Sequence, residues 1–86
     1  MQTFWYSQAK KEYLFFVKNK PHSVKKIKIL IEDIKKEPYE GLGKPEALKY
    51  ELKGWWSRRI SQEDRLVYRI ENDAIYIASC RYHYEK

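Results

Sequence analysis

The most regular hydrophobic pattern of the chain lies between its first two prolines, Pro21 and Pro38. Aliphatic residues recur there at spacings of three and four, which places them on one face of a helix. They are Val24, Ile27, Leu30, Ile31 and Ile34. Proline suits the first turn of a helix and stops one further along, because it lacks the backbone N–H that continues the hydrogen bonding. The pattern therefore predicts an amphipathic helix from Pro21 to just before Pro38.

A second pair of elements precedes this helix. Residues 3–6 join a threonine to three aromatic residues and predict a short strand. Ser7 then offers a hydroxyl group as the N-cap of a helix that reaches about Lys18.

After Pro38 the hydrophobic period changes from 3.6 to 2. Residues 39–45 are rich in turn formers and predict a connector. The strands that we expect beyond it cover residues 48–52, 55–60, 65–71 and 74–82, with turns at 53–54, 61–64 and 72–73. Within 65–71, Leu66, Tyr68 and Ile70 face one side, and Arg65, Val67 and Arg69 face the other. Arg65 is therefore expected opposite the core.

This order of elements predicts the α+β class. We expect a short N-terminal strand and two helices packed on one face of a curved, mainly antiparallel sheet of about five strands. Residues 1–86 form a single domain in this interpretation, and the uncovered face of the sheet is the candidate site.

Composition adds a preference for an anionic partner. The chain carries 18 Lys and Arg against 12 Asp and Glu, a net charge of +6. All five arginines lie after residue 57, and arginine grips phosphate more specifically than lysine does. The single cysteine excludes an intramolecular disulfide, and with two histidines it falls short of a structural zinc site. We expect a cytoplasmic protein with no membrane span, no metal and no cofactor.

The residues of the open face suit the binding or cleavage of RNA. Metal-free cleavage needs a base for the 2′-hydroxyl group, cations for the phosphorane charge and an acid for the leaving oxygen. Glu46, the arginines and His83 fit these roles, while Trp55, Trp56, Tyr82 and Tyr84 offer flat surfaces for bases. Glu46 has a simpler alternative as a local ion-pair partner of Lys49, and a lone histidine near a chain end is often incidental.

Alternation along the strands limits these assignments. Arg58 and Arg59 are adjacent and point to opposite faces, so one of them joins the Arg65 surface and the other braces a loop or helix. Trp55 and Trp56 diverge in the same way. Cys80 is expected in the core.

Four ordered blocks of the sequence resemble a known family. They are PYEGLGKPEALK at 38–49, GWWSRRI at 54–60, DRLVY at 64–68 and CRYHY at 80–84. Together they resemble the YoeB/Txe ribosome-dependent mRNA interferases, which are toxins of toxin–antitoxin pairs within the RelE-like group. The resemblance spans nearly the whole chain.

This resemblance implies a function and a set of residue roles. It implies a bacterial toxin that cuts mRNA in the A site of the 70S ribosome, without metal, and that a cognate antitoxin neutralises. Glu46 corresponds to the general base, His83 to the general acid and Arg65 to the main phosphate contact. Tyr84 completes the catalytic set as an aromatic residue that positions the substrate and assists the leaving oxygen. The residues that bind RNA or phosphate are Lys49, Arg58, Arg59 and Tyr82. The family also implies a possible homodimer.

One departure from the family concerns the C-terminus. Family members commonly finish at the tyrosine that matches Tyr84, whereas this chain continues through Glu85 and Lys86. The alternative to an enzyme is a non-catalytic module that holds RNA or the ribosome with the same basic, aromatic face. A carboxylate at position 46 favours the enzyme, since it repels phosphate in a mere binding surface but serves as a base in a nuclease.

Overall fold

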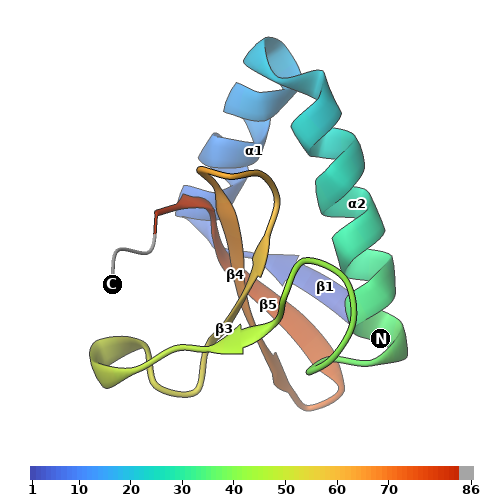
Figure 1. The fold of residues 1–86 in the computed structure, drawn as a ribbon, viewed down its shortest axis with the longest axis vertical. Helices are drawn as coiled ribbons and strands as arrows, with labels where there is room; N and C mark the ends of the chain where they lie inside the picture. The colour runs from blue at the N-terminus through green and yellow to red at the C-terminus, as the bar shows by residue number, and fades with distance from the viewer. Residues whose placement is uncertain (84–86) are drawn as a thin grey trace.

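Two helices and a sheet make up the computed structural model, which describes residues 1–83 (Figure 1). The helices are α1 (Ser7–Asn19) and α2 (Pro21–Lys36), and a short 3₁₀ helix, η1, covers Tyr50–Leu52. The strands are β1 (Gln2–Trp5), β2 (Glu46–Ala47), β3 (Trp56–Arg59), β4 (Arg65–Glu71) and β5 (Ala74–Tyr82). Neither α-helix in this part of the chain is long and apolar enough to cross a bilayer.

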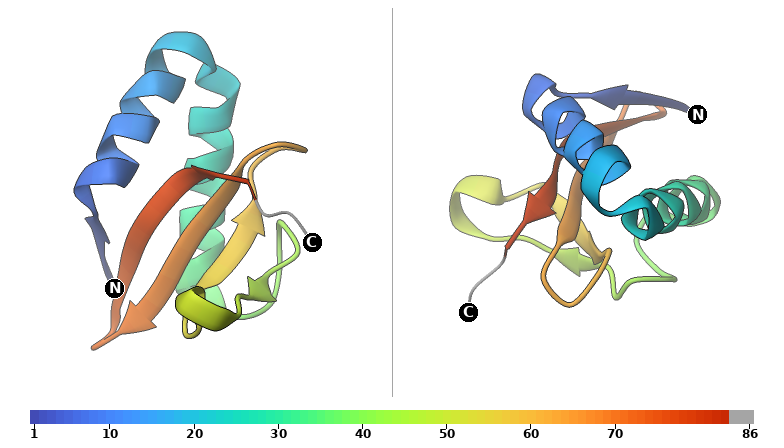
Figure 2. Two further views of the ribbon diagram at one scale, coloured as in Figure 1. Left: turned by 90° about the vertical axis from the view of Figure 1, so that its left-hand side faces the viewer. Right: turned by 90° about the horizontal axis from the view of Figure 1, so that it is seen from above.

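The five strands form one sheet in the order β1-β5-β4-β3-β2. β1 runs parallel to β5, and the other neighbours are antiparallel. Both helices lie on the same side of this sheet (Figure 2). The predicted class, with two helices on one face of a mainly antiparallel sheet, is therefore confirmed.

The core lies between the helices and the covered face of the sheet. Its fully buried side chains come from both layers: Phe16, Ile27, Leu30 and Ile34 from the helices, and Leu66, Tyr68, Ile75, Ile77 and Cys80 from β4 and β5. The predicted helical stripe and the predicted core position of Cys80 are confirmed. Burial of these apolar side chains is the main favourable term that holds the sheet and the helices together.

Two local predictions were wrong. Residues 48–52 do not form a strand, because the chain pairs only at Glu46–Ala47 and then turns through η1, where Tyr50 has a φ of 58°. The amide of Leu48 still bonds the carbonyl of Trp55 at 2.9 Å, so the apolar pattern there reflects anchoring of a loop. Ser7 is the first helical residue, and Tyr6 is the N-cap without a side-chain hydrogen bond.

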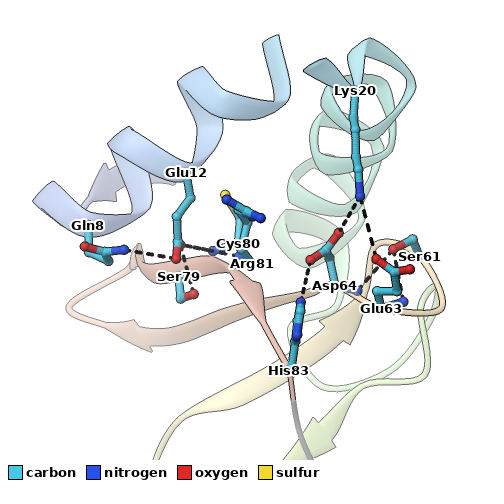
Figure 3. A network of polar contacts seen from close by, with 10 residues as sticks. All are labelled: Gln8, Glu12, Lys20, Ser61, Glu63, Asp64, Ser79, Cys80, Arg81 and His83. Atoms are coloured by element: carbon cyan, nitrogen blue, oxygen red, sulfur yellow. Dashed lines mark hydrogen bonds and ion pairs between the residues drawn. The ribbon is translucent and has the colours of Figure 1, made fainter. Parts of the chain in front are cut away.

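A β-bulge changes the direction of the last strand. The register between β4 and β5 shifts twice between Arg65 and Tyr68. Glu12 on α1 supports this irregular stretch, since its Oε1 accepts hydrogen bonds from the Ser79 hydroxyl group and the Cys80 amide, both at 2.9 Å (Figure 3). Bulges leave ladder groups unpaired and re-aim nearby side chains, and here the re-aimed end of β5 leads into the candidate site.

Candidate active site

Glu46, Ser57 and Arg65 meet on the open face of the sheet. Glu46 is the register partner of Ser57 across β2 and β3, and such partners share a face. The Nη1 atom of Arg65 lies 3.6 Å from Glu46 Oε1 and 3.4 Å from the hydroxyl oxygen of Ser57. The structure thus gives Glu46 an arginine partner from a different strand. Sequence reasoning missed Ser57, because a lone serine between a tryptophan and an arginine carries no signal of its own.

Arg59 and Tyr82 extend this cluster sideways. Arg65 pairs with Arg59 on β3 and, through the shifted register, with Tyr82 on β5. Two guanidinium groups on adjacent strands repel each other, and an anion such as phosphate relieves that repulsion. Arginine also presents five donors in a planar fork that matches phosphate oxygens. This part of the face is therefore suited to a phosphate group.

His83 follows Tyr82 directly and is held by a carboxylate that the sequence did not single out. Its Nε2 atom lies 3.0 Å from Oδ1 of Asp64, in the turn between β3 and β4 (Figure 3). The His83 side chain is 58% exposed, whereas that of Asp64 is 3% exposed. Asp64 directly precedes Arg65, so the contact ties the imidazole ring to the turn that leads into β4.

The remaining predicted site residues divide into three outcomes. Lys49 is exposed in the segment between β2 and η1. Tyr84 lies outside the described residues. The prediction that Arg58 binds RNA was wrong, because its side chain is fully buried.

Arg58 braces the connector that leads to Glu46. It pairs with Asp33 of α2, and its Nη2 atom donates to the carbonyl groups of Glu37 and Glu40 at 2.6 and 2.9 Å. Its Nε atom donates to the Tyr68 hydroxyl group at 3.2 Å. The predicted split of the two adjacent arginines is therefore what the structure shows, with Arg59 exposed and Arg58 inside.

Asp33 completes this brace. Its Oδ2 atom also accepts a hydrogen bond from the Leu42 amide at 2.9 Å, and this bond and the Arg58 contact lower the pKa of the Asp33 carboxyl group. Gly41 approaches the same carboxylate so closely that a Cβ atom there would lie 2.2 Å from Oδ2. Further along, the carbonyl group of Gly43 accepts a hydrogen bond from the Arg59 amide at 2.7 Å. Residues 37–43 are thereby tied both to α2 and to β3.

A row of rings and one guanidinium group covers the other end of the open face. The guanidinium carbon of Arg69 lies 4.9 Å from the ring centroid of Trp55 and 5.8 Å from that of Tyr76. Tyr76 stacks in turn on Phe4 at 5.4 Å. Trp55 belongs to this face, while Trp56 packs against the core. Alternation along the strand had left open which of the two tryptophans faces inward.

Nothing in the described part of the chain forms a metal-binding cluster, since no three His, Cys, Asp or Glu side chains gather there. The chemistry that the residues themselves offer is acid–base and electrostatic, from the Glu46 carboxylate, the His83 imidazole ring and the paired Arg59 and Arg65.

Known proteins resemble this chain in sequence and in fold. Toxin YoeB of Escherichia coli K12 is 48% identical over 84 residues, which cover 98% of this chain and all of the relative. The YoeB dimer from Staphylococcus aureus superposes with a TM-score of 0.92 at 45% identity and 98% coverage of both chains. The heterotetrameric YoeB-YefM toxin-antitoxin complex of that organism gives 0.90, with the same identity and coverage. A family model described as the YoeB-like toxin of bacterial type II toxin-antitoxin systems matches residues 5–84. The chain therefore belongs to the YoeB-like toxin family of bacterial type II toxin–antitoxin systems.

Proposed function

We propose that this toxin is an endoribonuclease that cuts mRNA in the ribosomal A site of its bacterial host, in the cytoplasm, and so inhibits translation. The observation that carries the proposal is the Glu46–Arg65 pair on the open face, together with His83, which is held by the residue that precedes Arg65. A carboxylate beside a phosphate-binding guanidinium group weakens mere binding, but it is what abstraction of a 2′-hydroxyl proton requires.

The reaction needs three roles, which the family resemblance assigns to these residues. Glu46 removes the proton of the 2′-hydroxyl group, whose oxygen attacks the adjacent phosphorus atom. The bond from phosphorus to the 5′-oxygen breaks, and His83 gives that oxygen its proton. The products are a 2′,3′-cyclic phosphate and a 5′-hydroxyl end. Each transfer by a positioned acid or base contributes about 10²- to 10⁴-fold in rate.

The cations neutralise the charge that builds up on the phosphorane. Arg65 has donors enough to hold Glu46 on one edge and a phosphate oxygen on another. Arg59 and Lys49 add positive charge nearby, and preorganised donors of this kind act where the charge develops. Tyr84 is assigned by family resemblance to substrate positioning.

The aromatic row supports RNA as the substrate. Unpaired bases stack on aromatic rings and on guanidinium planes, and Trp55, Tyr76 and Arg69 present both on the face that carries Arg65. Tyr82, as the register partner of Arg65, offers a further ring at the reacting phosphate.

Two protein partners follow from the relatives. Because the S. aureus relative is described in a complex with YefM, we propose a cognate antitoxin for this chain. An acidic segment that folds on binding suits the basic face. The S. aureus YoeB dimer likewise supports a homodimer.

The test is primer extension on mRNA in a reconstituted translation reaction, with and without EDTA. Wild type should cut within the A-site codon, and Glu46→Ala and His83→Ala should each slow the cuts about 10²- to 10⁴-fold. Glu51→Ala and His22→Ala are matched controls, because both residues are exposed and lie outside the cluster. If wild type binds ribosomes but leaves every transcript whole, the protein is a binding module instead. If either site variant cuts at the wild-type rate, its assigned role is wrong.

A further inference from the structure

The contact between Asp64 and His83 joins two parts of the chain that lie 19 residues apart in sequence (Figure 3). Asp64 is 2% exposed, which is rare for a carboxylate and calls for partners that compensate its charge. Within residues 1–83, its carboxylate has two: His83 Nε2 at 3.0 Å from Oδ1, and Lys20 Nζ at 3.8 Å from Oδ2.

The turn that carries Asp64 does not need this side chain. The Asp64 carbonyl group accepts hydrogen bonds from the amides of Ile60 and Ser61 at 2.9 and 3.2 Å. Its amide donates to the Ser61 hydroxyl group at 3.1 Å. All three bonds use the main chain of Asp64, so its carboxylate is left to hold the imidazole ring and Lys20.

We propose that Asp64 is the positioning residue of His83, which fixes the ring so that Nδ1 faces the RNA. The inference rests on the proposed nuclease function, in which His83 is the general acid. An ionised carboxylate only accepts hydrogen bonds, so the Nε2 atom that touches Asp64 carries a proton. The second nitrogen, Nδ1, then delivers the proton to the leaving 5′-oxygen. The arrangement follows the same logic as a carboxylate that orients a catalytic histidine in hydrolases.

Positioning matters here because His83 follows the last residue of β5 and is more than half exposed. An imidazole ring at such a place turns freely unless something holds it, and misplacement of a reacting group by 1 Å costs about 10²-fold in rate. Lys20, at the junction of α1 and α2, stabilises the buried charge of Asp64. The ring is thus linked through Asp64 to the helical layer.

The chain offers a matched control in the neighbouring carboxylate. Glu63 Oε2 lies 3.7 Å from the same Lys20 Nζ atom, yet no contact joins Glu63 to His83 among the described residues. Glu63→Gln therefore removes an acidic partner of Lys20 without touching the ring.

The kinetic test is a double-mutant cycle in the ribosomal cleavage assay, under single-turnover conditions. Asp64→Ala should lower the cleavage rate about 10- to 100-fold with ribosome affinity unchanged, and Asp64→Asn, which keeps an acceptor oxygen, should restore part of the rate. In a His83→Ala background, Asp64→Ala should cost nothing further, because the two residues act as one unit. An equal loss in both backgrounds, or a full rate in Asp64→Ala while His83→Ala is slowed, overturns the proposal.

A spectroscopic test separates this inference from the nuclease function. The chain has two histidines, so ¹⁵N-labelled histidine gives ring signals that His83→Ala assigns at once. Asp64→Ala should shift the His83 Nε2 resonance, whereas Glu63→Gln should leave that resonance unchanged. The His22 signals should stay the same in both variants. An unshifted resonance shows that the contact is absent in solution and refutes the inference. Failure of wild type to cleave RNA, with the shift present, refutes the nuclease function instead.

Discussion

Arg58 and Arg59 are identical side chains on adjacent residues, and their surroundings give them opposite tasks. Arg58 is fully buried among carbonyl groups, Asp33 and the Tyr68 hydroxyl group, whereas Arg59 is exposed beside Arg65. A buried charge is tolerated only where its donors are satisfied, and five hydrogen bonds satisfy Arg58.

The Asp33 carboxylate should make stability sensitive to acid. Its pKa is lowered from the ordinary value of 3.8 by the Leu42 amide and Arg58. A group whose pKa is depressed on folding stabilises the protein above its unfolded pKa, and this contribution is lost as the pH falls through the folded value. Urea unfolding midpoints should therefore drop steeply below pH 3.8 in wild type, and Asp33→Asn should flatten that slope. Equal slopes in both proteins would contradict the role of Asp33.

Cys80 should be chemically inert in the folded protein. Burial raises the pKa of its thiol group to about 12, and the thiolate is the reactive form. Iodoacetamide at pH 8 should leave the native protein unmodified and label it fully in urea, as mass spectrometry would show. Labelling of the native protein at the rate of a free thiol would show that β5 opens locally.

At the scale of elements, the connector between α2 and β2 decides where Glu46 stands. Gly41 and Gly43 have φ values of 120° and 77°, and both lie where the connector closes on Asp33 and β3. Glycine occupies such backbone conformations without strain. The turn signal of this segment was readable in the sequence, but its anchoring by the buried Arg58 was not.

Gly41→Ala and Gly54→Ala should differ in their effect on stability. Both positions have positive φ, so both substitutions pay a backbone cost of about 1–2 kcal/mol. Only Gly41 adds a clash, because its Cβ atom would lie 2.2 Å from Asp33 Oδ2 while that of Gly54 meets nothing within 4 Å. Urea denaturation should show Gly41→Ala as clearly less stable than Gly54→Ala. The opposite order would refute the close approach.

At the scale of the whole molecule, the charge of +6 and the open face of the sheet act together. The helices cover one side of the sheet (Figure 2), and the paired Arg59 and Arg65 lie on the other side. A positive net charge attracts a polyanion at long range, and in the proposed function the paired Arg59 and Arg65 bind its phosphate group.

Binding of single-stranded RNA should accordingly weaken with salt. The logarithm of the affinity falls linearly with the logarithm of salt concentration, by about 0.7 for each phosphate contact on a single strand. Fluorescence anisotropy with the His83→Ala protein should show such a slope, and Arg59→Ala should reduce it by about one contact. Lys18→Ala, at the C-terminal end of α1, is the control with an unchanged slope. An unchanged slope in Arg59→Ala would show that Arg59 does not contact the RNA.

The sequence by itself determined the elements and the family. Periods of 3.6 and 2 are properties of short segments, which is why α2, β4 and β5 were predicted within a residue or two. The segment at 48–52 failed because a two-residue edge pairing followed by a 3₁₀ turn leaves the same alternation as a strand. Tertiary structure alone decided which arginine and which tryptophan face the site, since alternation gives opposite faces without saying which is inside. It also decided the partners of the proposed acid and base, because the contacts of Asp64 with His83 and of Arg65 with Glu46 depend on strand register, bulges and turns that bring distant residues together.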